Sequence, residues 1–145
     1  MNIKNRKFII YTDGGSRNNP GPAGAGAVIQ DENGAVLKEA SKFVGVQTNN
    51  FAEYEAIIVG LTELKKLVPA GERKDVDVEV RMDSQLAQKQ LSNEYQIKVE
   101  NLFGQFIKVH NLIVADFPNV SFVHVPREQN KEADRLANEA MDRGA

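Results

Sequence analysis

Residues 8–16 read Phe8-Ile9-Ile10-Tyr11-Thr12-Asp13-Gly14-Gly15-Ser16, near the start of a chain of 145 residues. The first five are β-branched or aromatic, which favours a strand, and the acidic residue and paired glycines after them favour a turn. We therefore expect a strand that runs into a turn, with Asp13 at the strand's end. No helix follows for Asp13 to cap, so a purely structural role explains it poorly.

Two further apolar runs predict a meander with this first strand. They cover Ala23 to Gln30 and Val36 to Val44, and they flank Asp31-Glu32-Asn33-Gly34. Asn-Gly between two such runs is a strong signal for a β-hairpin. The first three strands are therefore expected to be antiparallel.

The rest of the sequence alternates between helical and strand patterns. In chain order we expect a helix over Phe51 to Val68, a strand over Val76 to Met82, a short helix from Ser84 to about Leu91, a longer helix over Val99 to Ile113, a strand over Val120 to Val125 and a last helix from near Gln129. This order predicts one α/β domain, residues 1–145. Its mixed five-stranded sheet has three antiparallel strands and then two strands parallel to the first, with helices on both faces.

Composition limits the chemistry and the setting. The chain has no cysteine, so any metal must be held by oxygen or imidazole ligands, and hard cations fit best. The net charge of -2 does not by itself indicate nucleic-acid binding, although cations bound by clustered acids would reverse the local field. Because the sequence shows no signal-peptide core and no apolar spanning segment, we expect a cytoplasmic protein without a membrane partner. We also expect it to act as a monomer.

Four carboxylates lie at the ends of predicted elements and could meet at one edge of the sheet. These are Asp13, Glu53, Asp83 and Asp134. Carboxylates brought together repel one another, and a hard divalent cation such as Mg²⁺ or Mn²⁺ relieves the repulsion. Two such ions about 4 Å apart can activate water on one side of a phosphodiester and stabilise the leaving oxygen on the other. Spacing thus leaves metal catalysis as a hypothesis.

Three of these acids also have a structural interpretation. Asn50 and Glu53 fit a capping box, and Asp83 could cap the helix that starts at Ser84. Asp134 could complement the dipole of the last helix. Spacing alone does not decide between the two interpretations.

The residues around each acid resemble the type 1 ribonuclease H family, from about Phe8 to Arg143. Four motifs match in order: Tyr11-Thr12-Asp13-Gly14-Gly15-Ser16-Arg17-Asn18-Asn19-Pro20-Gly21, Thr48-Asn49-Asn50-Phe51-Ala52-Glu53, Met82-Asp83-Ser84-Gln85, and Asn130-Lys131-Glu132-Ala133-Asp134-Arg135-Leu136-Ala137. Ser84-Gln85-Leu86, the segment around Tyr95 and residues 124–134 are most similar to a reverse-transcriptase-like subgroup of microbial and plant members.

This resemblance implies a catalytic site with two metal ions, Mg²⁺ or Mn²⁺. Asp13 would bridge both ions, Asp134 would join it at the ion that activates water, and Glu53 and Asp83 would complete the other site. It further implies substrate contacts from Gly14, Gly15, Ser16, Asn18, Asn49, Asn50, Gln85, Arg127 and Asn130. Small polar side chains and backbone groups of this kind suit the 2′-hydroxyl that distinguishes RNA from DNA. Gly14 and Gly15 as turn glycines, and Asn49 and Asn50 as caps, remain compatible with both roles.

Two departures from the family concern substrate handling. The loop before the last helix lacks the histidine that many members carry, and Arg127 is either its substitute at the phosphate or leaving group or a solvated residue. His124 is expected to be packed. The connection Ser92 to Lys98 has no room for the basic protrusion of some members. The candidate phosphate contacts are Lys89, Lys98, Arg127 and Lys131, and we expect weak, salt-sensitive binding.

The predicted activity is endonucleolytic hydrolysis of the RNA strand of an RNA–DNA hybrid, releasing 5′-phosphate products. Two alternatives keep the fold: a nuclease that also or mainly cuts double-stranded RNA, and a nucleic-acid-binding module without activity. A third uses the same metals to hydrolyse small phosphate esters.

Overall fold

The structure, a computed structural model, describes residues 6–92 and 102–145 except for the side chain of Leu86. Within these residues one sheet has the order β3-β2-β1-β4-β5. Its strands are β1 (Lys7–Ser16), β2 (Gly21–Asp31), β3 (Val36–Gln47), β4 (Asp77–Met82) and β5 (Val120–His124). β2 is antiparallel to β1 and β3, whereas β4 is parallel to β1 and β5. The predicted mixed sheet is confirmed.

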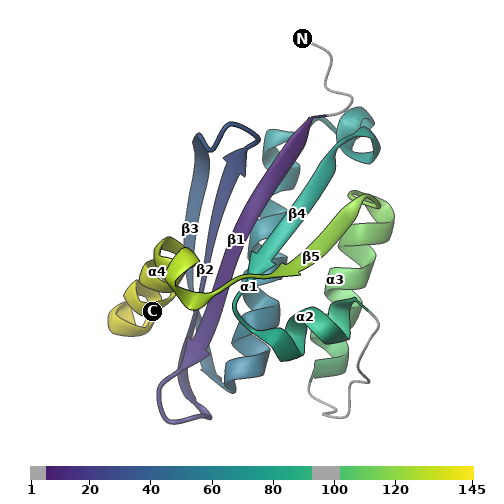
Figure 1. Cartoon of the computed structure of the whole chain (residues 1–145). Helices are drawn as coiled ribbons and strands as arrows, with labels where there is room; N and C mark the ends of the chain where they lie inside the picture. The colour runs from purple at the N-terminus through teal and green to yellow at the C-terminus, as the bar shows by residue number, and fades with distance from the viewer. Residues whose placement is uncertain (1–5, 93–101) are drawn as a thin grey trace.

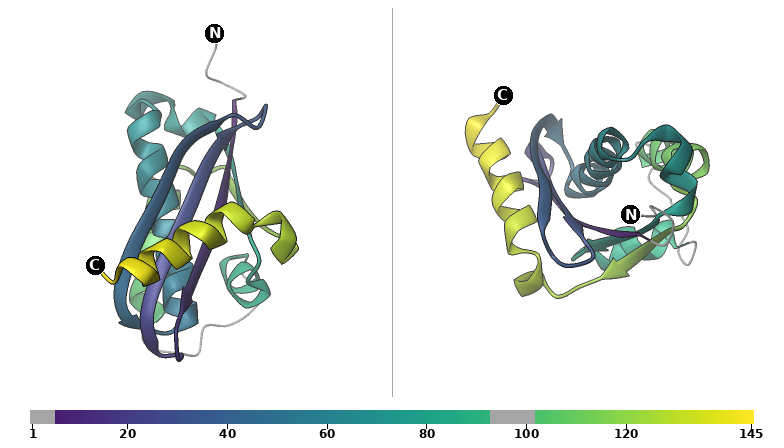
Figure 2. Two further views of the ribbon diagram at one scale, coloured as in Figure 1. Left: turned by 90° about the vertical axis from the view of Figure 1, so that its left-hand side faces the viewer. Right: turned by 90° about the horizontal axis from the view of Figure 1, so that it is seen from above.

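Helices cover both faces of this sheet, as predicted. They are α1 (Asn49–Leu67), α2 (Gln85–Leu91), α3 (Phe103–Ala115) and α4 (Lys131–Arg143), with short 3₁₀ segments η1 (Ala70–Asp75) and η3 (Arg127–Gln129). α1 and α3 lie against one face, and α4 crosses the other (Figures 1 and 2). The last helix starts two residues later than expected because η3 takes up the residues before it.

The main core lies between the sheet and α1. Every second residue of β1 and β4 points toward this helix, and the helix presents apolar residues at spacings of three and four. The largest buried side chains in this layer include Phe8, Ile10, Ile29, Tyr54, Ile57, Leu61, Leu64 and Met82. Each such aliphatic or aromatic side chain contributes roughly 1.5–3 kcal/mol on full burial. This layer fixes α1 relative to the strands that carry Asp13 and Asp83.

β1 is longer than its sequence predicts. Residues 13–16 do not form a turn but continue the strand and pair with residues 23–26 of β2. Gly14 is needed for close packing against the Ala52 backbone rather than for a turn, so the turn-like composition of this segment is misleading. The second hairpin is confirmed, because Gly34 has a φ of 84° and its N–H donates to the carbonyl of Asp31 at 3.0 Å.

The predicted helix caps are wrong for two acids. Thr48 caps α1, because its hydroxyl accepts a hydrogen bond from the Phe51 N–H at 3.2 Å, and Glu53 lies further into the helix. Ser84 caps α2 in the same way by accepting from the Ala87 N–H at 3.3 Å. Thr48 thus takes the place predicted for Asn50, and Ser84 takes the place predicted for Asp83. Neither Glu53 nor Asp83 is therefore needed for capping.

Several predictions concern residues 93–101, outside the described residues. They are the segment around Tyr95, the contact by Lys98, the helical start at Val99 and most of the connection from Ser92 to Lys98. Within the described ranges, no helix has the length and apolar character needed to cross a membrane.

Candidate active site

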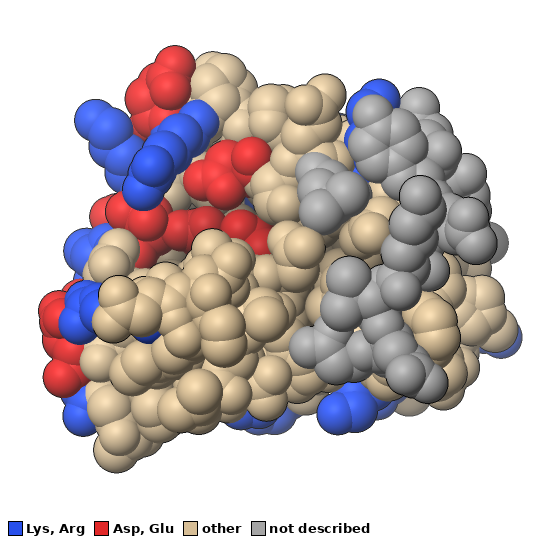
Figure 3. Space-filling view, turned by 90° about the horizontal axis from the view of Figure 1, so that it is seen from below, with Lys and Arg blue, Asp and Glu red and all other residues tan. Residues whose placement is uncertain are grey.

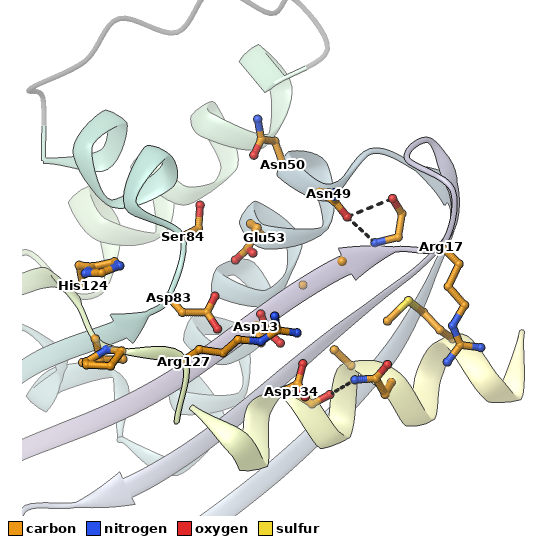
Figure 4. A pocket seen from close by; sticks show the side chains of 18 residues that line it. Asp13, Arg17, Asn49, Asn50, Glu53, Asp83, Ser84, His124, Arg127 and Asp134 are labelled. Atoms are coloured by element: carbon orange, nitrogen blue, oxygen red, sulfur yellow. Dashed lines mark hydrogen bonds between the residues drawn. The ribbon is translucent and has the colours of Figure 1, made fainter. Parts of the chain in front are cut away.

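Three of the four predicted acids converge at one place. Oxygen atoms of Asp13, Glu53 and Asp83 all lie within 4.8 Å of one another. Asp134 joins them, since it lies close enough to raise the pKa of Asp13 and lines the same groove. Figure 4 shows the four side chains pointing toward one another from β1, α1, the end of β4 and the start of α4. The predicted convergence is therefore present.

Strand register brings Asp13 and Asp83 together. The parallel pairing of β1 with β4 ends at Thr12 opposite Met82, so Asp13 and Asp83 are the next residues of two neighbouring strands. β4 ends there, whereas β1 continues and pairs with β2 alone. Asp13 is thus inside its own strand but beyond the end of the neighbouring one, where functional groups of parallel strands gather.

Gly14 allows Glu53 to approach these two acids. A Cβ atom at Gly14 would lie 2.2 Å from the backbone of Ala52 and 2.6 Å from the Glu53 nitrogen. No side chain fits in that space, so the start of α1 rests directly on β1. The result is a Glu53 that is 9% exposed and faces Asp13 across the contact.

Glycines of β2 seat α4 in a similar way. A Cβ atom at Gly26 would lie 2.3 Å from the Ala133 carbonyl oxygen, and one at Gly24 would lie 2.3 Å from that of Ala137. Gly26 is also the residue opposite Asp13 in the β1–β2 pairing. Close seating of α4 on Gly26 therefore places Asp134, the residue after Ala133, beside Asp13.

Burial and mutual repulsion hold protons on this cluster. The pKa of Asp13 is raised from 3.8 to about 8. Burial is the main cause, followed by the charge of Asp83 and then by the hydrogen bond and charge of Asp134, while the Gly14 N–H opposes the shift. Burial, Asp13 and Asp83 also raise the pKa of Glu53 well above its usual value. A divalent cation would remove this cost by pairing with the ionised oxygens.

The carboxylates form the floor of an open groove of about 650 Å³. Acidic side chains gather in this hollow on the lower face of the molecule, with Lys and Arg beside them (Figure 3). Of the predicted substrate contacts, six line the groove: Gly14, Gly15, Ser16, Asn49, Asn50 and Arg127. Asn18 and Gln85 are exposed but are not part of its lining. The roles of all eight in substrate binding stay predictions.

Asn49 organises one wall of the groove. Its side-chain oxygen accepts hydrogen bonds from the Ser16 N–H at 2.7 Å and from the Ser16 hydroxyl at 3.2 Å. Its own N–H donates to the Asn19 side chain at 2.8 Å. Because the amide oxygen is engaged, the amide NH₂ of Asn49 is the group left to face a ligand in the groove.

Asn130 has a different role from the predicted one. It is 1% exposed, so it has almost no surface to offer to a substrate. Its side-chain NH₂ donates to the Thr12 carbonyl at 2.8 Å, and its own carbonyl accepts from the Asp134 N–H at 3.1 Å. Asn130 therefore ties the residue before Asp13 to the start of α4.

Several lining residues were not predicted: Arg17, Ser84, His124, Asn138 and Met141. The expectation that His124 is packed is wrong, because it is exposed at the end of β5 and lines the groove next to the segment carrying Asp83 and Ser84 (Figure 4). His124 pairs with Met82 in the sheet, and Asp83 follows Met82 directly, so this pairing is what places His124 beside the acids.

The chain matches the family described as reverse transcriptase-like over residues 11–140. Among solved structures, LC11-RNase H1 in complex with an RNA/DNA hybrid is 48% identical with a TM-score of 0.89, covering 94% of this chain and 97% of that one. LC11-RNase H1 was isolated from compost by a metagenomic approach. RNase H1 from the archaeon Halobacterium salinarum is 37% identical with a TM-score of 0.85, covering 94% and 98%.

A longer relative is the bifunctional protein Rv2228c of Mycobacterium tuberculosis. It is 40% identical over 140 residues, which cover 96% of this chain but 36% of that protein. The chain thus spans about a third of the length of this and two other mycobacterial relatives. The match over residues 11–140, the shared fold and the 48% identity together show that this chain belongs to the type 1 ribonuclease H family, in its reverse transcriptase-like group.

Proposed function

We propose that this chain is an endoribonuclease that hydrolyses the RNA strand of RNA–DNA hybrids and depends on divalent cations. The observation that carries the proposal is the convergence of Asp13, Glu53 and Asp83, whose oxygens lie within 4.8 Å of one another in an open groove. Support also comes from LC11-RNase H1, which is 48% identical over nearly its whole length and is bound to an RNA/DNA hybrid.

The donor set fits Mg²⁺ or Mn²⁺. All four side chains offer carboxylate oxygens, which hard cations prefer, and both causes of the raised pKa of Asp13, burial and the neighbouring acids, would be offset by a bound cation. Asp13, Glu53, Asp83 and Asp134 would hold two ions. When bound, such ions supply a nucleophilic water and stabilise the charge that develops on the leaving oxygen.

The chain's own residues position these groups. In Figure 4 Asp13 lies between Asp134 on one side and Glu53 and Asp83 on the other, so it is suited to be the carboxylate shared by both ions. Asp134 is suited to the ion that activates water.

The groove walls suit a nucleic acid strand. Gly15, Ser16, Asn49 and Asn50 present backbone and small polar groups that can contact the 2′-hydroxyl of RNA. Arg127 extends over the carboxylates toward Asp13 in Figure 4, which places a permanent positive charge near a phosphate held there. We assign it to the scissile phosphate or to the leaving group.

The test is cleavage of a labelled RNA–DNA hybrid, with single-stranded RNA, RNA duplex and DNA duplex beside it, in Mg²⁺, in Mn²⁺ and in chelator. We expect cuts confined to the RNA strand of the hybrid, 5′-phosphate products and no activity in chelator. Asp13→Asn should lower cleavage at least about 10³-fold, because it removes the shared carboxylate. Asp77→Asn is the matched control, since Asp77 is exposed at the opposite end of β4.

The same assay separates the alternatives. Cutting of RNA duplex as fast as hybrid would widen the substrate class to double-stranded RNA. Activity on a simple phosphate ester with none on hybrid would indicate a small-molecule phosphohydrolase. Binding of hybrid without cleavage in either metal, or full activity in Asp13→Asn, would contradict the proposed mechanism.

A further inference from the structure

The groove carries positive charge at two separate places. Of the described residues that line it, Arg17 and Arg127 are the two with a permanent positive charge. Arg127 reaches the carboxylates from the connection after β5. Arg17 lies on the other side of the carboxylates, beside the second half of α4 (Figure 4). The four carboxylates therefore lie between Arg17 and the β5 end of the groove.

Arg17 is held by contacts that keep it at the groove wall. Its backbone N–H donates to the Pro22 carbonyl at 3.0 Å, which fixes the first residue of the β1–β2 turn. Its guanidinium donates through Nη2 to Asp142 Oδ1 at 2.6 Å. The side chains of Arg17 and Asp142 are 47% and 68% exposed, so water and ligands can reach the pair.

We propose that Arg17 binds a phosphate of the RNA strand, on the side of the cleavage site away from Arg127. This proposal rests on the proposed function, because it assumes that a strand lies along the groove with its scissile bond at the carboxylates. A strand in that position carries a negative charge at every nucleotide, and ions at the carboxylates neutralise the charge at the cut alone. A neighbouring phosphate that passes Ser16 and Asn49 meets Arg17 next.

The magnitude of the ion pair favours an exchange of partners. An exposed Arg–Asp pair contributes roughly 0–1 kcal/mol to stability. A backbone phosphate carries the same single negative charge as Asp142, but its two non-bridging oxygens can accept two bonds from the guanidinium, whereas Asp142 accepts one bond, through Nη2. Asp142 then acts as a holder that orients Arg17 before substrate arrives and competes weakly with the phosphate.

The first test is hybrid binding as a function of salt, measured in the Asp13→Asn background to prevent cleavage. Arg17→Ala should weaken binding by about 3- to 10-fold and lower the slope of log affinity against log salt by about one. Arg143→Ala is the matched control. Arg143 is an exposed residue at the end of α4, next to Asp142, but it donates to the Ser41 and Ala145 carbonyls outside the groove. Asp142→Ala should tighten binding slightly, because it removes a negative charge that competes with the phosphate for Arg17.

A second measurement identifies the phosphate. Uncharged methylphosphonate linkages are introduced one at a time into the RNA strand and then into the DNA strand. We expect one RNA linkage, next to the cut, whose neutralisation weakens binding in the Arg17-containing protein and has no further effect in Arg17→Ala. Such non-additivity at a single position would not arise if Arg17 only stabilised the fold.

The outcomes separate this inference from the proposed function. If the Arg17-containing protein binds no hybrid, the proposed function fails. If it binds hybrid but Arg17→Ala behaves like Arg143→Ala, or if the sensitive linkage lies in the DNA strand, the assignment of Arg17 is overturned and the proposed function stands.

Discussion

The floor and the rim of the groove are held in different ways. The floor consists of Asp13, Glu53, Asp83 and Asp134, and its two most buried acids are 8% and 9% exposed. Backbone contacts through Gly14 and Gly26 fix the helices that supply it. The rim comprises Arg17, Asn49, His124 and Arg127 and is exposed. Among the described residues, the Arg17 side chain makes one hydrogen bond, to Asp142, and the Asn49 side chain makes two, both with Ser16. Changes under the floor should therefore alter catalysis and stability together, whereas changes at the rim should alter affinity.

Among changes that should alter catalysis and stability together, the largest effect is expected at Gly14. In Gly14→Ala the new methyl group would collide with the Ala52 backbone, so α1 must move away from β1 and take Glu53 with it. We expect a loss of about 1–3 kcal/mol in the free energy of unfolding. Cleavage should fall on the order of 10²-fold, because a displacement near 1 Å at a catalytic group has that effect. Denaturant unfolding and hybrid cleavage measure the two quantities.

Gly104→Ala is the control for Gly14→Ala. Gly104 lies in the exposed first turn of α3, has no atom within 4 Å of an added Cβ, and should gain a few tenths of a kcal/mol, up to about 1, from reduced backbone freedom. If Gly14→Ala keeps full activity, the seating of α1 on β1 does not set the position of Glu53.

The contrast at Gly14 also shows what the sequence can and cannot predict. The directions of the strands, the helices on both faces and the convergence of the four acids follow from hydrophobic period and local motifs. The role of Gly14 does not, because Asp-Gly-Gly has the composition of a turn and the Ala52 backbone that requires a glycine is distant in sequence. Thr48 and Ser84 were missed as caps because neighbouring Asn50 and Asp83 are equally good candidates by type.

Contacts between distant parts of the chain account for the other differences. Asn130 and Thr12 are 118 residues apart, and Arg17 and Asp142 are 125 apart, so no local pattern marks either pair. Motif position suggested a substrate contact for Asn130, and tertiary packing makes it a buried tie. Local sequence thus predicts the floor's chemistry, whereas the supports of the floor and the charges of the rim become visible only in the folded chain.

The next effect is the dependence of the unfolding free energy on pH, which should come from Asp13 in the floor and not from the exposed residues of the rim. The pKa of Asp13 is about 8 in the folded protein, whereas the ordinary value for an exposed Asp is 3.8. Between these two pH values the folded state therefore retains a proton that the unfolded chain releases. Stability from this group is complete below about pH 4 and is lost as pH rises toward 8. The metal-free protein should therefore lose several kcal/mol of unfolding free energy across that window.

Asp13→Asn should flatten this dependence, and saturating Mg²⁺ should reverse it by binding the ionised cluster. Denaturant unfolding at pH 5 and pH 8, with and without Mg²⁺, measures both. Asp142→Asn, at the exposed residue that pairs with Arg17 of the rim, should leave the profile unchanged. An unaltered slope in Asp13→Asn would mean that the buried proton resides elsewhere.

The smallest expected effect lies at Asn130, which joins the floor to α4 without touching a substrate. Asn130→Ala leaves the Thr12 carbonyl without its 2.8 Å partner and should cost about 1–2 kcal/mol of unfolding free energy. Because Asp134 donates its N–H to the Asn130 carbonyl, movement of this segment displaces Asp134 from Asp13. We expect kcat to fall by roughly 10-fold with KM nearly unchanged, since the rim keeps its contacts with the substrate.

Asn119→Ala provides the comparison for Asn130→Ala, because the Asn119 side chain makes the same kind of bond to the Lys74 carbonyl at 3.0 Å, exposed and away from the groove. It should change neither kcat nor KM. A rise in KM without a change in kcat for Asn130→Ala would instead place Asn130 among the substrate contacts. A loss of stability with both constants unchanged would show that Asp134 keeps its position without the tie to Thr12, so that the seating of α4 on Gly26 is sufficient to hold the fourth carboxylate in the floor.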